Sequence, residues 1–261
     1  EHGSTGRARS GLEQPSGSIC RQATHLLPQK RENGVSQSTP WKNGYLKGKE
    51  MNYYISDHHF GHVRMNSDID CRGFADVEAM DEYMIEQWNR KVKAEDEVFI
   101  LGDLTAFTDG EQVNQLLGRL AGKKTLLIGN HDRYLEDPAF DKELFTRITP
   151  YLELWDNGKK VVLSHYPIMF YNEQYLLDQD GKPRTFMLYG HVHNGPDEQV
   201  IMEYLEKVKD RMKKNLKTGE PEPAPCRMIN CFCMFSDYVP LTLEDWIRTD
   251  RARRKVAQRE K

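Results

Sequence analysis

Residues 186–195 read FMLYGHVHNG, in which two histidines stand on either side of a single valine. A glycine lies on each flank, and an apolar run comes just before the histidines. Histidine is a common metal ligand and titrates near neutral pH. If residues 186–189 form a strand, His191 and His193 reach its carboxyl end on the same side, because alternate residues share a face. The spacing therefore predicts two imidazoles that serve two neighbouring ions, one each.

Polar side chains also follow four other predicted strands. They are Asp57 and His59 after residues 52–56, Asp103 after 97–101, Asn130, His131 and Asp132 after 124–128, and His165 after 160–164. All seven histidines beyond residue 50 lie in these clusters or in a loop directly after one. Ligands of α/β sheets collect beyond the carboxyl ends of the strands, so we expect these groups to converge on one site.

The converging groups supply carboxylate, amide and imidazole ligands but no sulfur. We interpret seven of them as metal ligands: Asp57, His59, Asp103, Asn130, His165, His191 and His193. Such a set suits divalent Mn, Fe, Zn, Co or Ni and does not suit a structural thiolate zinc. Seven ligands are too many for one ion and suit two ions that share a bridging carboxylate. Two ions about 3.5–4 Å apart can clamp the attacking and leaving oxygens at phosphorus, which predicts a phosphoesterase.

The elements that must position these groups alternate along the chain. Apolar runs predict strands at 52–56, 97–101, 124–128, 160–164, 185–189 and 228–235. Amphipathic spacing predicts helices at 76–92, 109–120 and 199–216, and TLEDW begins a short helix at residue 242. The segment KTGEPEPAP that ends the third helix predicts a loop. Alternation of strands and helices indicates an α/β layered fold.

The order DxH, GD, GNHD, H and GHxH over residues 57–193 resembles the calcineurin-like metallophosphoesterase superfamily, with all five blocks in sequence. The run DHHFGH…CRGF…MDEYMIEQWN is most similar to the small bacterial and phage phosphoesterases of unassigned substrate. The resemblance implies a four-layer α-β-β-α sandwich of two mixed sheets, which we expect over residues 51–247.

The resemblance also implies a role for each residue of the site. Asp57, His59 and His193 would hold the first metal, Asn130, His165 and His191 the second, and Asp103 would bridge them. A hydroxide between the ions would be the nucleophile, because metal binding brings the pKa of water close to neutrality. His131 would be the catalytic histidine and Asp132 its orienting partner. We expect manganese, with iron, zinc, nickel or cobalt as alternatives.

Three residues outside the ligand set are candidates for binding the substrate phosphate. His62 follows a glycine turn, and its alternative role is a structural hydrogen bond. Arg133 comes directly after GNHD and Arg72 lies in CRGF, and either guanidinium could bind phosphate through two parallel hydrogen bonds. A surface salt bridge is the alternative for each arginine.

The composition bounds the remaining classes. The 261 residues suffice for one domain with a buried core, and 38% of them are hydrophobic and 30% charged. No apolar stretch approaches the roughly 18–20 residues of a membrane span, so no membrane role is expected. The five cysteines are odd in number and form no CxxC pair. This count argues against a disulfide framework and a zinc ribbon, and favours a cytoplasmic location.

The two ends of the chain differ from its body. Residues 1–50 are rich in Gly, Ser, Gln, Pro and Arg and lack a secretory signal, so we interpret them as a disordered arm or a non-native extension before Met51. Residues 248–261 carry seven basic and two acidic residues, which predicts a basic tail.

Three functions compete. The basic tail could hold a nucleic-acid backbone, which would make the protein a nuclease of the same fold. The net charge of −3 favours a small phosphorylated substrate instead. A non-catalytic protein-binding scaffold is the third alternative, but it predicts missing ligands and none is missing. The helix expected at 199–216 could cover the site or pair with a partner subunit in a dimer.

Overall fold

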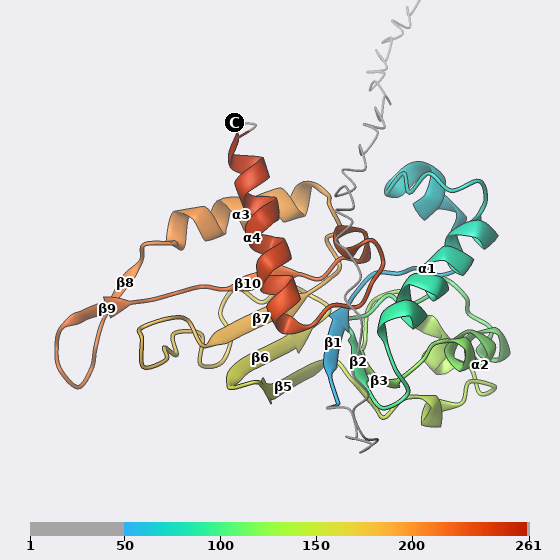
Figure 1. The fold of residues 1–261 in the computed structure, drawn as a ribbon, viewed down its shortest axis with the longest axis horizontal. Helices are drawn as coiled ribbons and strands as arrows, with labels where there is room; N and C mark the ends of the chain where they lie inside the picture. Colours follow the sequence, from blue (N-terminus) through green and yellow to red (C-terminus); the bar gives the residue numbers. More distant parts are fainter. Residues whose placement is uncertain (1–49, 260–261) are drawn as a thin grey trace, which may run out of the picture. The chain divides into compact units, whose positions relative to one another are not determined.

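The computed structural model describes residues 50–259, so the expectations about residues 1–49 and the final two residues lie outside the described part (Figure 1). Its first sheet has the order β1 (Asn52–Ile55), β2 (Glu97–Ile100), β3 (Lys123–Leu127) and β4 (Arg147–Thr149), parallel throughout. The second sheet has the order β10 (Met228–Asn230), β7 (Thr185–Tyr189), β6 (Lys159–Ser164) and β5 (Tyr151–Asp156), and only β5 is antiparallel to its neighbour.

Helices cover the sheets, and short turns link the elements. The α-helices are α1 (Val77–Lys91), α2 (Gly110–Arg119), α3 (Pro196–Val208) and α4 (Leu243–Arg259). A π-helical turn spans Met65–Ile69, and 3-10 turns span Arg133–Glu136, Lys142–Leu144 and Cys233–Ser236. Asp76 and Asp109 are the N-caps of α1 and α2. The side chain of each accepts a hydrogen bond from the backbone N–H three residues further along the chain. Among these helices none has the length and apolar character needed to cross a bilayer.

Three apolar clusters hold the layers together. The cluster between the two sheets contains residues of both, among them Tyr54, Phe99, Leu127, Val161, Leu163, Phe186 and Leu188. The outer face of the first sheet packs against α1 and α2 through residues that include Tyr53, Val98, Met84, Trp88 and Val113. The outer face of the second sheet packs against α3 through Val162, Met187, Ile201 and Leu205. Both faces of each sheet are therefore buried, as the near-continuous apolar strands require.

The expected α/β class with several sheets is confirmed, and the details differ in three places. Strands expected at 52–56, 97–101, 124–128, 160–164 and 185–189 appear as β1, β2, β3, β6 and β7. The first sheet is parallel and not mixed. The strands β4 and β5 were not predicted, because they lie at sheet edges and are largely half-exposed.

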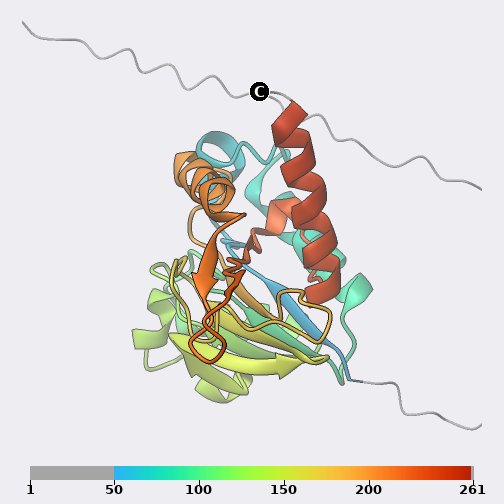
Figure 2. The same ribbon diagram turned by 90° about the vertical axis from the view of Figure 1, so that its left-hand side faces the viewer.

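Three expectations for the C-terminal third are wrong. The helix expected at 199–216 ends at Val208, and its last residues form β8 (Met212–Lys214) instead. Strand β8 pairs with β9 (Pro221–Pro223), which lies in the segment expected to be a loop (Figures 1 and 2). Proline has no backbone N–H, and this isolated ribbon tolerates it because other residues supply the donors between the strands. Those donors are the backbone N–H groups of Asn215 and Ala224. The strand expected at 228–235 ends at Asn230 and leads into a 3-10 turn, after which Asp237 has a left-handed backbone with φ of 53°.

The basic run at the C-terminus belongs to a helix up to Arg259. Helix α4 continues without a break across residue 247, where the tail was expected to begin. Arg253 donates to Glu198 Oε1 at 2.9 Å, and Glu198 is only 1% exposed. Arg254 donates to the carbonyl oxygen of Met228 on β10 at 2.9 Å. These two arginines anchor α4 to the second sheet and to α3, so they are not free to bind a partner.

We expect the substitution Arg253→Ala to lower the free energy of unfolding by about 1–3 kcal/mol, because it removes a charged donor from a buried carboxylate. Arg251→Ala is the matched control, since Arg251 is exposed on the same helix. That substitution should change the free energy of unfolding by less than about 0.5 kcal/mol. Denaturant titration of both variants measures the difference, and equal losses would contradict the anchoring role.

Candidate metal centre

Each predicted ligand lies directly beyond the carboxyl end of a strand. Asp57 follows β1, Asp103 follows β2, His165 follows β6 and His191 follows β7. Backbone hydrogen bonds join these loops, because Asp57 N donates to the Gly102 carbonyl oxygen and Gly190 N donates to that of His165. A parallel bridge between Ser56 and Phe232 joins the chain beyond β1 to the chain beyond β10. The two sheets therefore bring their carboxyl ends to one place.

The ligands form two adjoining groups. The first contains Asp57, His59 and His193, the second contains Asp103, His165 and His191, and within each group the ligand atoms lie within 4.8 Å of one another. Asp103 Oδ2 lies 3.6 Å from His59 Nε2 and 3.5 Å from His165 Nε2, so it lies between the groups. Asn130 Oδ1 is 3.1 Å from His165 Nε2, on the side of the second group. The structure thus places all seven predicted ligands at one site.

Contacts behind the histidines set their tautomers. His193 Nδ1 lies 2.7 Å from Asp70 Oδ1, and His165 Nδ1 lies 2.8 Å from the Leu101 carbonyl oxygen. Both oxygens accept, so each Nδ1 carries a proton and each Nε2 can present a lone pair to the site. Partners of this kind orient the histidines of metal sites.

The spacing of two imidazole nitrogens suits a shared ion. His59 Nε2 lies 3.2 Å from His193 Nε2. Two nitrogens bound to one tetrahedral ion, each about 2.0–2.1 Å from it, lie roughly 3.3 Å apart. His193 Nε2 is also 3.6 Å from Asp57 Oδ1, which completes a set of nitrogen and oxygen donors around the same point. The residues present therefore fit a divalent transition-metal ion in the first group.

Burial controls the protonation of the ligands. It lowers the pKa of His59, His165 and His191, so these imidazoles are neutral near pH 7 and can bind a metal ion. Burial also raises the pKa of Asp57 and Asp103. A divalent cation held between these carboxylates favours their ionised form, because it supplies the opposite charge that burial otherwise denies them.

His193 is an exception among the ligand histidines. Burial acts to lower its pKa, but the hydrogen bond to Asp70 and the negative charge of Asp57 outweigh that effect and raise it. Burial also acts to raise the pKa of Asp70, but hydrogen bonds from His193 and Arg72 hold it below its ordinary value. Asp70 is therefore ionised and remains an acceptor for His193.

Left-handed backbone conformations aim five of the seven ligands. They are Asp57 at φ 57°, His59 at 51°, Asp103 at 54°, His191 at 74° and His193 at 49°. Such a conformation costs roughly 1–3 kcal/mol for a residue other than glycine. Residues in strained conformations cluster at functional sites, where the surrounding structure holds them. Five strained residues at one site indicate that the surrounding structure holds these side chains in place at a cost in local stability.

Two glycines allow the backbone to approach the carboxylates. A Cβ added at Gly190 would lie 2.5 Å from Asp57 Oδ2, and one added at Gly129 would lie 2.3 Å from Asp103 Oδ1. Both distances are far inside van der Waals contact. Gly190 therefore lets the chain after β7 enter the site, and Gly129 does the same for the chain after β3.

Asp132 has a different role from the one expected for it. Its carboxylate is buried and accepts backbone hydrogen bonds from Gly129, Asp103 and Leu104 at 2.8–3.0 Å. It therefore joins the chain after β3 to the chain after β2, and it does not orient His131. The His131 ring is half-exposed, with its centroid 5.1 Å from that of His59, and its backbone N–H donates to Asp103 Oδ1 at 2.8 Å.

The three candidates for phosphate binding separate in the structure. His62 lies near the first group, with its ring 5.7 Å from that of His59 and 6.4 Å from that of His131. Arg133 is exposed beside His131. Arg72 is buried beneath the site, where it donates to the carbonyl oxygens of Asp57 and His58 and to Asp70. The expectation for Arg72 is therefore corrected, because its donors support the ligand loop and do not face the open side.

Asp70 is the functional residue that the sequence did not reveal. It connects the ligand His193 to the buried Arg72, which in turn holds the loop of Asp57. In the sequence it is one of two aspartates in the polar stretch NSDID and belongs to no motif. The only available signal was its distance of two residues from an arginine in CRGF.

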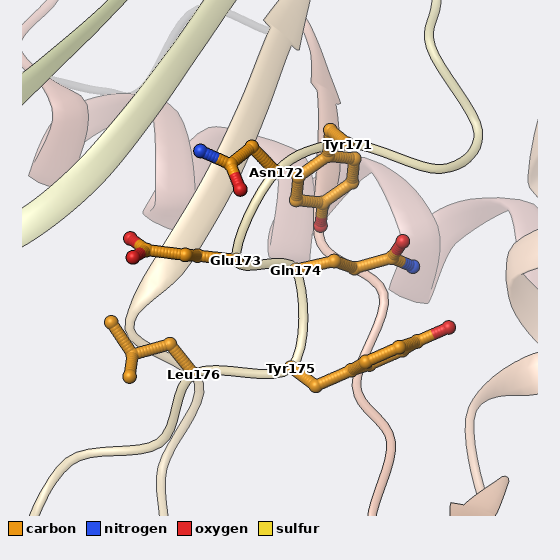
Figure 3. Close-up of a pocket in the computed structure, with 6 residues that line it drawn as sticks. All are labelled: Tyr171, Asn172, Glu173, Gln174, Tyr175 and Leu176. Carbon is orange, nitrogen blue, oxygen red and sulfur yellow. The ribbon is translucent and has the colours of Figure 1, made fainter.

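A separate hollow of about 440 Å³ is lined by residues 171–176 of the loop between β6 and β7 (Figure 3). None of the predicted ligands lines it. The side chains of Gln174 and Tyr175 point to one side of this loop, and those of Glu173 and Leu176 point to the other. Because these side chains diverge, the hollow does not gather polar groups as the metal centre does.

Comparisons with known proteins agree with the geometry. A family model described as calcineurin-like phosphoesterase matches residues 53–226. An uncharacterized protein of Methanocaldococcus jannaschii is 32% identical over 142 residues, which cover 54% of this chain and 68% of that protein. The Gene 66 protein of Mycobacterium phage D29 is 29% identical over 163 residues, which cover 54% of this chain and 78% of that protein.

Among solved structures, a protein of unknown function from Aquifex aeolicus has a similar fold. The TM-score is 0.50 at 24% identity, over 76% of this chain and 97% of that one. At this identity the likeness extends to the fold alone. The family model, which covers more than half of the chain, and the ordered ligand blocks lead to one assignment. The chain belongs to the calcineurin-like phosphoesterase family.

Proposed function

We propose that this protein hydrolyses a phosphomonoester or phosphodiester at a centre of two divalent metal ions. The position of Asp103 carries the proposal, because one carboxylate oxygen lies within 3.6 Å of an imidazole from each group. When bound, the two ions would act as Lewis acids and lower the pKa of water, whose hydroxide between them would attack phosphorus. Manganese is the ion that we expect, and iron, zinc, nickel and cobalt suit the same donors.

The protein itself contributes binding and proton transfer. Asp57, His59 and His193 would hold one ion, Asn130, His165 and His191 the other, and Asp103 both. The His131 imidazole lies on the half-exposed side of the first group, where it can donate a hydrogen bond to a phosphoryl oxygen or a proton to the leaving oxygen. His62 lies on that side too, and the exposed Arg133 lies two residues after His131 in the sequence, so both are candidates for binding the phosphate.

The competing functions are less well supported. The nuclease alternative relied on the basic run at 248–261, but Arg253 and Arg254 are engaged with buried partners. The scaffold alternative predicts lost ligands, and all seven are present at the site. We therefore favour a small phosphorylated substrate. The four-layer α-β-β-α order is part of the same proposal, supported by apolar clusters between the sheets and on both outer faces.

Removal of metal tests the proposal directly. We expect the purified protein to release para-nitrophenol from para-nitrophenyl phosphate or its bis ester, to lose this activity after chelation and to regain it with Mn²⁺. Elemental analysis should find about two ions per chain, as a two-metal site requires. Full activity in a rigorously metal-free preparation would overturn the proposal. Metal binding without turnover of either ester would favour the scaffold.

His131→Ala separates catalysis from metal binding. The backbone N–H that bonds Asp103 survives the substitution, so metal occupancy should remain close to that of the wild type. Turnover should fall by roughly 10²–10⁴-fold, the usual contribution of a positioned acid–base group. Steady-state kinetics and elemental analysis of the same preparation measure both quantities. A parallel fall in metal content would make His131 a ligand.

Asp70→Asn tests the support of His193. We expect this substitution to lower the affinity for the first ion by about 10–100-fold and to leave the affinity for the second largely unchanged. Loss of a carboxylate behind a ligand histidine has effects of this size. Asp68→Asn is the matched control, since Asp68 is exposed two residues away and pairs only with Arg64 among the described residues. Competition with a metal-binding dye measures both affinities. Equal weakening of the two ions, or an equal effect of the control, would contradict the role of Asp70.

A further inference from the structure

The loop that follows the ligand His165 exposes three large apolar side chains within five residues. Tyr166 is 47% exposed, Met169 37% and Phe170 66%. Ile168 between them turns inward and packs against the cluster beneath α3. A soluble protein rarely gathers large apolar side chains on its surface unless they bind something. We call these three side chains, of which Tyr166 and Phe170 are aromatic and Met169 is apolar, the aromatic wall.

Tyr166 packs directly against the second ligand group. Its ring centroid lies 4.9 Å from that of His165 and 4.6 Å from that of His191, with interplanar angles of 75° and 64°. These are edge-to-face contacts, which are favourable between aromatic rings. One part of the Tyr166 ring therefore fixes it beside the two imidazoles, and the exposed part borders the place where a substrate would bind.

Helix α3 extends the wall away from the metals. The ring of Tyr204 lies 6.4 Å from that of Phe170. Val200, one turn earlier on the same helix, is 61% exposed. The apolar surface thus begins beside His191 and continues onto α3. This surface is larger than a single phosphate group would need.

The side of the first group has the opposite character. His62 and His131 lie there with rings 6.4 Å apart, and Arg133 and Arg64 are exposed nearby in the sequence. Imidazole and guanidinium groups suit phosphate oxygens. The site is therefore polar on one side and aromatic on the other, which would orient an ester with one charged end and one apolar end.

We propose that the aromatic wall binds the organic group of the substrate and selects esters in which that group is a planar ring. The proposal rests on the proposed function, since it concerns the same site. A planar ring can stack on the exposed part of Tyr166 while the phosphate lies over the metals. A methyl group in the same place gains less, because it buries less apolar area and forms no aromatic pair with Tyr166.

Two phosphonates that differ only in their organic group isolate this contact. Phenylphosphonate and methylphosphonate share the charged end and are not hydrolysed, so calorimetry on the metal-loaded protein measures binding alone. We expect the wild type to prefer the phenyl compound and Tyr166→Ala to bind it about tenfold more weakly, with methylphosphonate changed less than about twofold. Tyr166→Phe should retain the preference, because it keeps the ring.

The control is Trp155→Leu, which removes an exposed aromatic residue from the far end of the second sheet. Trp155 is 54% exposed on β5, opposite Lys160 near the start of β6. Its substitution should leave the affinities for both phosphonates unchanged. Metal content is measured for every variant. If Tyr166→Ala retains less metal than the wild type, Tyr166→Leu replaces it, since leucine keeps apolar packing on His191 but removes the ring.

The outcomes separate the two proposals. If neither phosphonate binds and no ester is hydrolysed, the proposed function fails. If methylphosphonate binds, but the wild type shows no preference for phenyl or Tyr166→Ala and Tyr166→Leu weaken both compounds equally, the aromatic wall only packs against the ligands. In that case the inference is overturned and the phosphoesterase stands.

Discussion

Asp103 joins the two halves of the site, and the surrounding loops depend on its position. Its Oδ2 lies between imidazoles of both groups, and its Oδ1 accepts the backbone N–H of His131. The chain after β3 approaches this carboxylate so closely that only glycine fits at position 129. Asp132 accepts hydrogen bonds from the loops after β2 and β3 and so holds them at this separation. The backbone N–H of His131 satisfies Oδ1, and a bound cation would supply the opposite charge for Oδ2.

The layers beneath the site supply the rigidity that strained ligands need. Five ligands have left-handed backbones, each unfavourable by itself. One buried and one partly buried ion pair lie behind the ligand loops. Asp70 and Arg72 support His193 and the Asp57 loop, while Glu198 receives Arg253 and also Asn230, which donates to the His193 carbonyl oxygen. The C-terminal helix thus reaches the metal centre through polar contacts, and its basic residues are partly structural.

The proposed function assigns the two ends of the substrate to different sides of the site. The imidazoles of His62 and His131 on the side of the first group suit phosphate oxygens. Exposed aromatic side chains on the side of the second group match an apolar ring. The same histidines that can bind metal also anchor Tyr166, so the position of the aromatic wall follows from the position of the ligands.

The sequence by itself determined the strands β1, β2, β3, β6 and β7 and singled out the seven candidate ligands, because both signals are local. Buried strands are short apolar runs, and each ligand follows one of them within a few residues. Only the tertiary structure decided the roles of Asp70, Arg72, Asp132 and Arg253. Each of the four has a partner at least 15 residues away, and His193 lies 123 residues from Asp70 and Glu198 lies 55 from Arg253. The sequence does not show whether a charged side chain faces solvent or a buried partner. Only the packing of the folded chain distinguishes these two environments. The same limit applies to β8, β9 and the end of α3, because the pairing of β8 with β9 is not a local signal.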